Sequence, residues 1–173
     1  MSAQRDERFG DFLSRQPERL VITGFRCCMA GYDFLDVACW ETGWQCYIGE
    51  VGPEQARALM GEAQSGVRTI RYSSQKSVSY YPQGCRQLCH DECMALSAIS
   101  AAQGSDAVAG RMATRHLIGS NDGGSIDGVW TATQGFAQAL VHSGQPLYPV
   151  TAAVVQSIGN MQALATVPAK DMN

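Results

Sequence analysis

The chain has 173 residues, of which 45% are hydrophobic and 17% are charged, and its formal net charge is -3. This length suits a single domain over residues 1–173 with a core of its own. The slightly acidic balance argues against nucleic-acid binding through bulk positive charge, and the sequence contains no apolar run of about 18 residues that would predict a membrane span. The charged start MSAQRDERFGDF lacks the apolar core of a signal peptide, which predicts a cytoplasmic protein.

The first third of the sequence predicts a short helix, a strand and an irregular region. Over residues 6–19, apolar positions at helical spacing predict a short amphipathic helix that Pro17 limits. The β-branched run at 20–23 predicts a short strand. Residues 31–50 are rich in cysteine and aromatic residues, and Gly43 interrupts their helical spacing, so we expect the irregular part of the fold here.

The rest of the sequence predicts helices joined by loops. Residues 72–84 contain Ser, Tyr and Pro and predict a loop. The segments with an apolar stripe at helical spacing predict helices over residues 53–70, 85–103, 106–118, 125–142 and 151–164. The fold class we expect is therefore mainly α: a single-domain bundle of about five or six helices with one irregular region rich in cysteine and aromatic residues.

Cys85, Cys89 and Cys93 form the most informative pattern, with the spacing C-x3-C-x3-C. At about 100° per residue, the three thiols would lie on one face of the predicted helix, together with the apolar side chain of Leu96. Cys85 would stand at the helix N-terminus, where the helix dipole favours a thiolate. The thiol stripe is thus expected to face the core.

Three thiols on one stripe favour a soft metal. Cys85 and Cys93 would be about 12 Å apart along an ideal helix, which is too far for one tetrahedral zinc ion to bind all three thiolates. A multinuclear centre is larger, so we expect an iron–sulfur cluster on Cys85, Cys89 and Cys93, with Cys39 or Cys28 as a further ligand. Cu(I) and Zn are the alternative metals. The same spacing resembles the C-x3-C repeats of cytosolic copper-storage four-helix bundles, which carry many more cysteines.

The expected function is that of a small metal-thiolate protein for electron transfer, cluster delivery or sensing. Two other interpretations of the seven cysteines stay open: buried small hydrophobic residues, and a redox-active thiol without metal. Neither a serine elbow nor a phosphate-binding P-loop is present in the sequence, so it does not decide whether the protein is an enzyme.

Glu92 falls in the apolar arc of the helix predicted over residues 85–103, where a carboxylate needs a partner. Three roles are open: it accepts hydrogen bonds from Arg26, it serves as an oxygen ligand, or it holds a proton. A slight rotation of the helix would instead leave the carboxylate at the rim, and we expect this simpler arrangement.

Residues 119–169 contain two charged residues, Asp122 and Asp127. A solvated helical surface normally carries more charge, so this stretch predicts a surface covered by a protein partner or by a second copy in a homodimer. It supports an alternative function, that of a non-catalytic structural or interaction subunit of a larger complex whose cysteines only pack the core.

Overall fold

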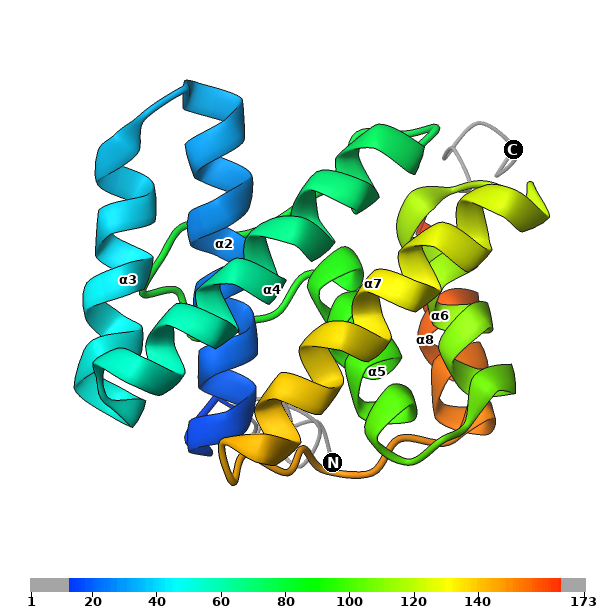
Figure 1. The fold of residues 1–173 in the computed structure, drawn as a ribbon. Helices are drawn as coiled ribbons and strands as arrows, with labels where there is room; N and C mark the ends of the chain where they lie inside the picture. The colour runs from blue at the N-terminus through cyan, green and yellow to red at the C-terminus, as the bar shows by residue number, and fades with distance from the viewer. Residues whose placement is uncertain (1–12, 166–173) are drawn as a thin grey trace, which may run out of the picture.

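The computed structural model describes residues 13–165, with side chains through residue 161, and this part of the chain is helical without a strand (Figure 1). Its seven helices are α2 (Gln16–Phe34), α3 (Val37–Val51), α4 (Pro53–Ser73), α5 (His90–Gln103), α6 (Ala107–Ile118), α7 (Gly123–His142) and α8 (Ala152–Ala165). The mainly α, single-domain bundle predicted from the sequence is confirmed. The described helices number seven rather than five or six.

The helices pack as neighbouring pairs. Helices α2 and α3 form an antiparallel hairpin at one end of the molecule, α4 lies along α7, and α5 packs on α6 (Figure 1). Helix α8 packs on α5 and α6 at the opposite end from the hairpin. In this part of the chain, no helix is both long and apolar enough to cross a membrane.

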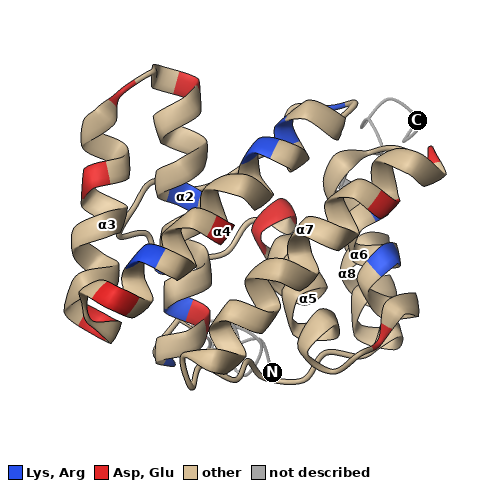
Figure 2. Ribbon diagram, viewed as in Figure 1, with Lys and Arg blue, Asp and Glu red and all other residues tan. Residues whose placement is uncertain are grey.

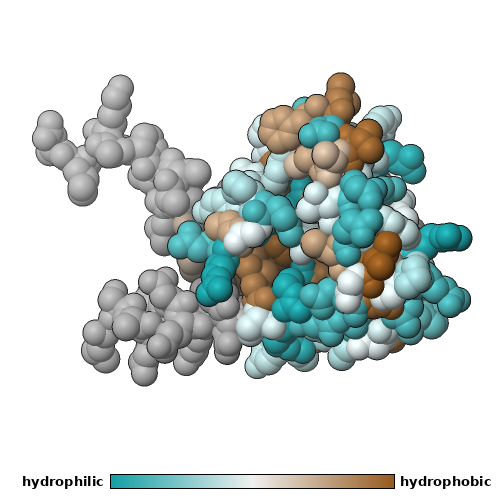
Figure 3. All heavy atoms as spheres, turned by 90° about the vertical axis from the view of Figure 1, so that its left-hand side faces the viewer, coloured by the Kyte–Doolittle hydropathy of each residue, from teal (hydrophilic) through white to brown (hydrophobic). Residues whose placement is uncertain are grey.

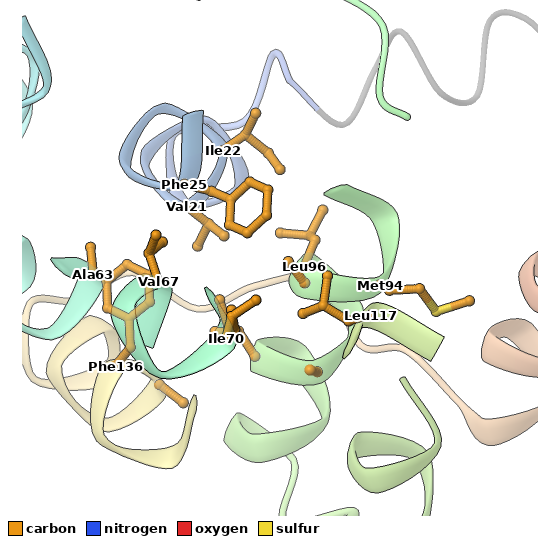
Figure 4. Packing of buried hydrophobic residues seen from close by; sticks show 14 of the residues in the cluster. Val21, Ile22, Phe25, Ala63, Val67, Ile70, Met94, Leu96, Leu117 and Phe136 are labelled. Carbon is orange, nitrogen blue, oxygen red and sulfur yellow. The ribbon is translucent and has the colours of Figure 1, made fainter. Parts of the chain in front are cut away.

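Side chains from five helices meet in the core. Figure 4 shows Phe25 of α2, Ile70 of α4, Leu96 of α5, Leu117 of α6 and Phe136 of α7 directed toward one another. Each of these side chains is less than 9% exposed, so together they remove a large apolar surface from water. The shared core makes the helix pairs into one unit.

Local signals explain several helix boundaries. Helix α4 begins with Pro53, whose missing N–H costs nothing at the first helical position. The Asp106 carboxylate caps α6 by accepting a hydrogen bond from the Ala109 N–H at 3.0 Å. Helix α7 begins slightly earlier than expected, because Asp122 caps it through the Ser125 N–H at 2.8 Å.

The predicted strand at 20–23 is wrong, because these residues lie inside α2. Leu20, Val21 and Ile22 are 0–2% exposed, so contacts with the rest of the protein outweigh the β preference of branched side chains. Half of the helix predicted over 6–19 lies outside the described residues. In the other half the prediction that Pro17 limits a helix is wrong, because α2 begins at Gln16 and Pro17 lies in its first turn, where proline is tolerated.

The irregular region is also in a different place from that predicted. Residues 31–50 are almost entirely helical, belonging to the end of α2 and to α3, and the long non-helical connection is instead residues 74–89. Gly43 lies within α3 and lets this helix pack closely on α2, since a Cβ atom at position 43 would lie 2.9 Å from the Cβ of Cys27. The glycine that predicted a break in the helix instead marks a place where two helices are in close contact.

Candidate functional site

The predicted cysteine stripe does not form, because residues 85–89 are not helical. Cys85 lies in the connection between α4 and α5, Cys89 is the N-cap residue of α5, and Cys93 alone of the three lies within the helix. The predicted position of Cys85 at a helix N-terminus is therefore wrong. A helix from residue 85 would have placed all three thiols on one face.

Hydrogen bonding explains why α5 starts late. A helix through residue 85 needs the Cys89 N–H to donate to the Cys85 carbonyl oxygen. Both groups have other partners: the Cys85 carbonyl accepts from Arg26 Nη1 at 2.7 Å, and the Cys89 N–H donates to Glu92 Oε2 at 3.0 Å. Gly84, at φ 90°, supplies the left-handed turn that precedes Cys85. The helical turn at Cys85 is thus replaced by contacts with two charged side chains.

Arg26 and Glu92 form a buried ion pair between α2 and α5. Arg26 Nε lies 2.5 Å from Glu92 Oε1 and Nη2 lies 3.0 Å from Oε2, and the two side chains are 4% and 0% exposed. Arg26 Nη2 also donates to the Gln87 carbonyl at 2.7 Å, while Glu92 Oε1 accepts from the Tyr81 N–H at 3.0 Å. The expectation that Glu92 lies at the rim is wrong, and the alternative with Arg26 as donor is the one found.

Asp91 also binds the connection between α4 and α5, at Lys76 and Ser79. Its carboxylate is buried, lies 2.5 Å from Lys76 Nζ and accepts the Ser79 N–H at 2.8 Å. Figure 2 shows these acidic residues at the centre of the molecule, where α5 begins. Two consecutive carboxylates in the first turn of α5 therefore fix the connection to the helix, and they also suit the positive end of its dipole.

Two histidines lie beside this cluster. His90 Nδ1 lies 3.1 Å from the Asp91 carboxylate, and its ring centroid is 6.2 Å from that of His116 in an edge-on arrangement. Burial, with His90 and Arg115 nearby, lowers the pKa of His116. The neutral imidazole is therefore favoured at this position.

The remaining predicted ligands lie on the α2–α3 hairpin. Cys28 is completely buried in the core, and Cys39 is half-buried in the first turn of α3. Cys27, which the prediction did not include, lies near Cys39 and Cys46 and is buried against α3. The structure thus divides the cysteines between two regions, the hairpin and the start of α5.

Burial keeps several thiols protonated. It raises the pKa of Cys27 and Cys89 to about 11 and that of Cys28 and Cys93 to about 12, from an ordinary value of 9.0. The Cys89 thiol accordingly donates a hydrogen bond to the Ser79 carbonyl at 3.3 Å. These thiols are poor nucleophiles at neutral pH, because the thiolate is the reactive form.

The predicted ligands do not converge. Across residues 13–161, no three side chains among His, Cys, Asp and Glu form a group that could hold a metal ion. Cys85, Cys89, Cys93, Cys39 and Cys28 therefore do not constitute a preformed ligand set. The iron–sulfur centre stays a prediction.

The hollows in the described surface include three that have a cysteine in their wall. One, of about 530 Å³, lies between α2, α3 and the connection and includes Cys46 and Cys85 in its wall. A second, of about 440 Å³, lies across the same connection beside Cys39 and Tyr80. The third, of about 360 Å³, is the α5–α8 groove, lined by Leu88, Cys93, Leu96, Ser97, Val150, Ala153, Val154, Ser157, Ile158 and Met161.

The α5–α8 groove differs from the other two because none of the described residues that line it is charged. Val154 and Met161 on α8 are 47% and 60% exposed, so large apolar side chains face water at its wall. Its large apolar side chains on α8 lie at 154, 158 and 161, a helical spacing visible in the sequence, and Val150 precedes the helix. The sequence pattern of α8 does not predict that α5 forms the facing wall, because that depends on how the two helices pack.

The charge-poor stretch at 119–169 divides between two environments. Helix α7 carries one charged residue, Asp127, and α8 carries none (Figure 2). Helix α7 packs along α4, whereas α8 borders the groove.

Comparisons with protein families, curated proteins and solved structures find no match for this chain. The site itself must therefore carry any functional argument.

We expect Glu92→Gln to lower the free energy of unfolding by about 3–5 kcal/mol, because it leaves the buried Arg26 guanidinium without its counter-charge. Glu50→Gln is the matched control, since Glu50 pairs with Arg19 at 2.9 Å on the surface and its loss costs about 1 kcal/mol or less. Urea unfolding followed by circular dichroism measures both. Equal effects of the two substitutions would contradict the structural role of the buried pair.

The buried thiols also predict how stability depends on pH. In the unfolded chain they ionise near 9.0, but in the folded protein only near 11–12, so between these values the folded state binds more protons. Stability is therefore unaffected by these thiols below pH 9 and falls as the pH rises above it. Urea unfolding at pH 8 and pH 10 should show the loss, and Cys28→Ala should remove about 1.4 kcal/mol of it. The same pH dependence in that variant would contradict this origin.

Proposed function

We propose that this protein is a non-catalytic interaction subunit whose α5–α8 groove binds an uncharged apolar segment of a protein partner. The observation that carries the proposal is the groove itself: about 360 Å³ between two helices, where the wall formed by the described residues has apolar and small polar side chains and no charge. A hollow of this size falls in the range of concave, mostly apolar binding sites in proteins.

The chemistry of the wall defines the partner. An ionised side chain entering the groove would lose its hydration without finding a counter-charge, so the contact should contain apolar side chains. Burial of Val154 and Met161 under a partner removes apolar surface from water, which favours association. Cys93 suits such a wall, since a protonated thiol behaves as a small polarizable apolar group.

Two of the other cysteines, Cys27 and Cys28, fit a subunit of this kind as packing residues. Cys27 and Cys28 lie on α2, and their side chains are 3% and 0% exposed in the core. Their raised pKa values keep them neutral, as expected of core residues. This supports the alternative that the sequence left open, in which the cysteines serve as packing.

Site-specific photo-crosslinking tests this proposal. A benzoylphenylalanine at position 154, in the groove, should crosslink to a partner in cells, whereas the same group at position 108 should not. Val108 is a suitable control because it is also an exposed valine, 69% against 47%, and does not line the groove. Adding Met161→Glu, a substitution at an exposed residue of the same groove, should reduce the crosslink at least tenfold. No crosslink at 154, or equal crosslinks at both positions, would contradict the proposal.

A metal-thiolate function is the second candidate. Its specific support is the closeness of some thiols: Cys89 is near enough to raise the pKa of Cys93, and Cys39 and Cys46 are near enough to raise the pKa of Cys27. An iron–sulfur cluster, Cu(I) or Zn would use such thiols as thiolates, and the function would then be electron transfer, cluster delivery or sensing. Ligation by Cys85 together with Cys89 and Cys93 would require the connection to move relative to α5.

Elemental analysis with an absorption spectrum on anaerobically purified protein tests this candidate. It predicts stoichiometric metal that a Cys89→Ser/Cys93→Ser variant loses and a Cys46→Ser variant keeps, with charge-transfer absorption if the metal is iron. Metal at trace levels in the wild-type protein, or metal equally retained by both variants, would contradict this assignment.

A further inference from the structure

We infer that protonation of His116 weakens the packing of α8 on α5 and α6, so that the α5–α8 groove loses one of its walls as the pH falls. His116 lies in the last turn of α6, and α8 packs on both α5 and α6. The consequence for binding rests on the proposed function, because α8 is one wall of the same groove.

Helix α8 is attached to the bundle by a narrow buried stripe. Among its residues with described side chains, Val155 and Gly159 are buried, four positions apart on one face, and Ile158 is partly buried. Val154 and Met161 are 47% and 60% exposed. A helix with so few buried contacts opens at a small cost in free energy, so one added charge beneath it is enough to change its packing.

The ring of His116 lies directly against this stripe. A Cβ atom on Gly159 would lie 2.7 Å from both Nε2 and Cε1 of the ring, so the imidazole contacts α8 at a place where only glycine leaves room. A positive charge on the ring would therefore lie between α6 and α8, at the contact that holds the two helices together.

Helix α8 offers nothing that balances such a charge, because it carries no charged residue. Charged residues are found instead on the α2–α3 hairpin, whose hydrophilic surface Figure 3 shows and which lies at the opposite end of the molecule. An imidazolium against α8 would lose hydration without gaining a counter-charge, which favours detachment of the helix.

The groups on the other sides of His116 are mainly bases. Burial, His90, Arg115 and Lys76 all lower its pKa, and the His90 ring centroid lies 6.2 Å from that of His116. The Asp91 carboxylate is already bound by Lys76 at 2.5 Å and by His90 at 3.1 Å. The C-terminal end of α6 favours a cation, but Arg115 in the same turn already supplies one.

Helices α4 and α7 also pack on α6, and their charges have other partners. Asp127 of α7 pairs with Arg111, and Asp122 caps α7 itself. Arg71, in the last turn of α4, pairs with Asp33. These groups therefore leave the imidazole without a free carboxylate as partner.

These surroundings determine the direction of the pH effect. The pKa of His116 is lowered from its ordinary value of 6.5 in the folded protein, and it returns toward 6.5 when α8 detaches. The detached state then binds more protons, so the packing of α8 is unaffected well above pH 6.5 and weakens as the pH falls below it. Between pH 7.5 and pH 5.5, one such group favours detachment by at most about tenfold.

Hydrogen–deuterium exchange of the full chain at pH 7.5 and pH 5.5, corrected for the intrinsic rate at each pH, tests the inference. The amides of α8 should exchange about three- to tenfold faster at the lower pH, and those of α7 should not. His116→Gln should remove this pH dependence, whereas His142→Gln, at an exposed histidine in the last turn of α7, should retain it. Equal exchange of α8 at both pH values in the wild-type protein, or the same acceleration in His116→Gln, would overturn the inference.

A reciprocal titration needs no substitution of His116. Gly159→Ala places a Cβ atom against the ring and detaches α8, so it should raise the pKa of His116 toward 6.5, as followed by NMR of the imidazole Cε1–H. Gly128→Ala on α7 is the matched control, because a Cβ atom there would meet no group within 4 Å, and it should leave this pKa unchanged. An unchanged pKa in Gly159→Ala would overturn the inference.

Both measurements use the protein without a partner, whereas the position-154 crosslink reports the partner itself. A crosslink at position 154 together with pH-independent exchange of α8 would overturn the inference and leave the proposed function standing. Acceleration of α8 exchange without that crosslink would support the role of His116 and contradict the proposed function.

Discussion

The buried pair of Arg26 and Glu92 is the interaction on which the middle of this structure depends. It joins α2 to α5 through two charged side chains that are almost fully buried, and these also bond to the Tyr81 N–H and the Gln87 carbonyl. Such a pair is favourable only if its partners are all in place, since either charge alone would be costly to bury. The connection between α4 and α5 must therefore take the one path that supplies those backbone groups.

This constraint also decides the positions of the cysteines. Arg26 binds the Cys85 carbonyl and Glu92 binds the Cys89 N–H, so α5 begins at His90 and not at Cys85. Cys85 therefore lies outside the helix that contains Cys93. Cys93 then remains in the helix, where it lines the wall that α5 presents to α8. The ion pair thus disfavours a three-thiol stripe and leaves an apolar groove, which is why the geometry supports an interaction subunit better than a metal centre.

Predictions from the sequence succeeded where the signal was local. Pro53 at the start of α4, the Asp106 cap of α6 and the apolar stripes of α7 and α8 lie within one or a few helical turns, and the structure has helices there. They failed where a distant contact outweighed the local preference. The strand expected at 20–23 is helical because its residues are buried by other helices, and Gly43 admits Cys27 instead of breaking α3.

The sequence by itself determined the helical class, most helix boundaries and the absence of charge along α8, because periodicity, capping and composition are properties of neighbouring residues. Only the tertiary structure decided that Glu92 pairs with Arg26, that the predicted ligands do not converge, and that α5 and α8 enclose a groove. Arg26 and Glu92 are 66 residues apart in the chain, and a contact over that separation leaves no periodic trace in the sequence.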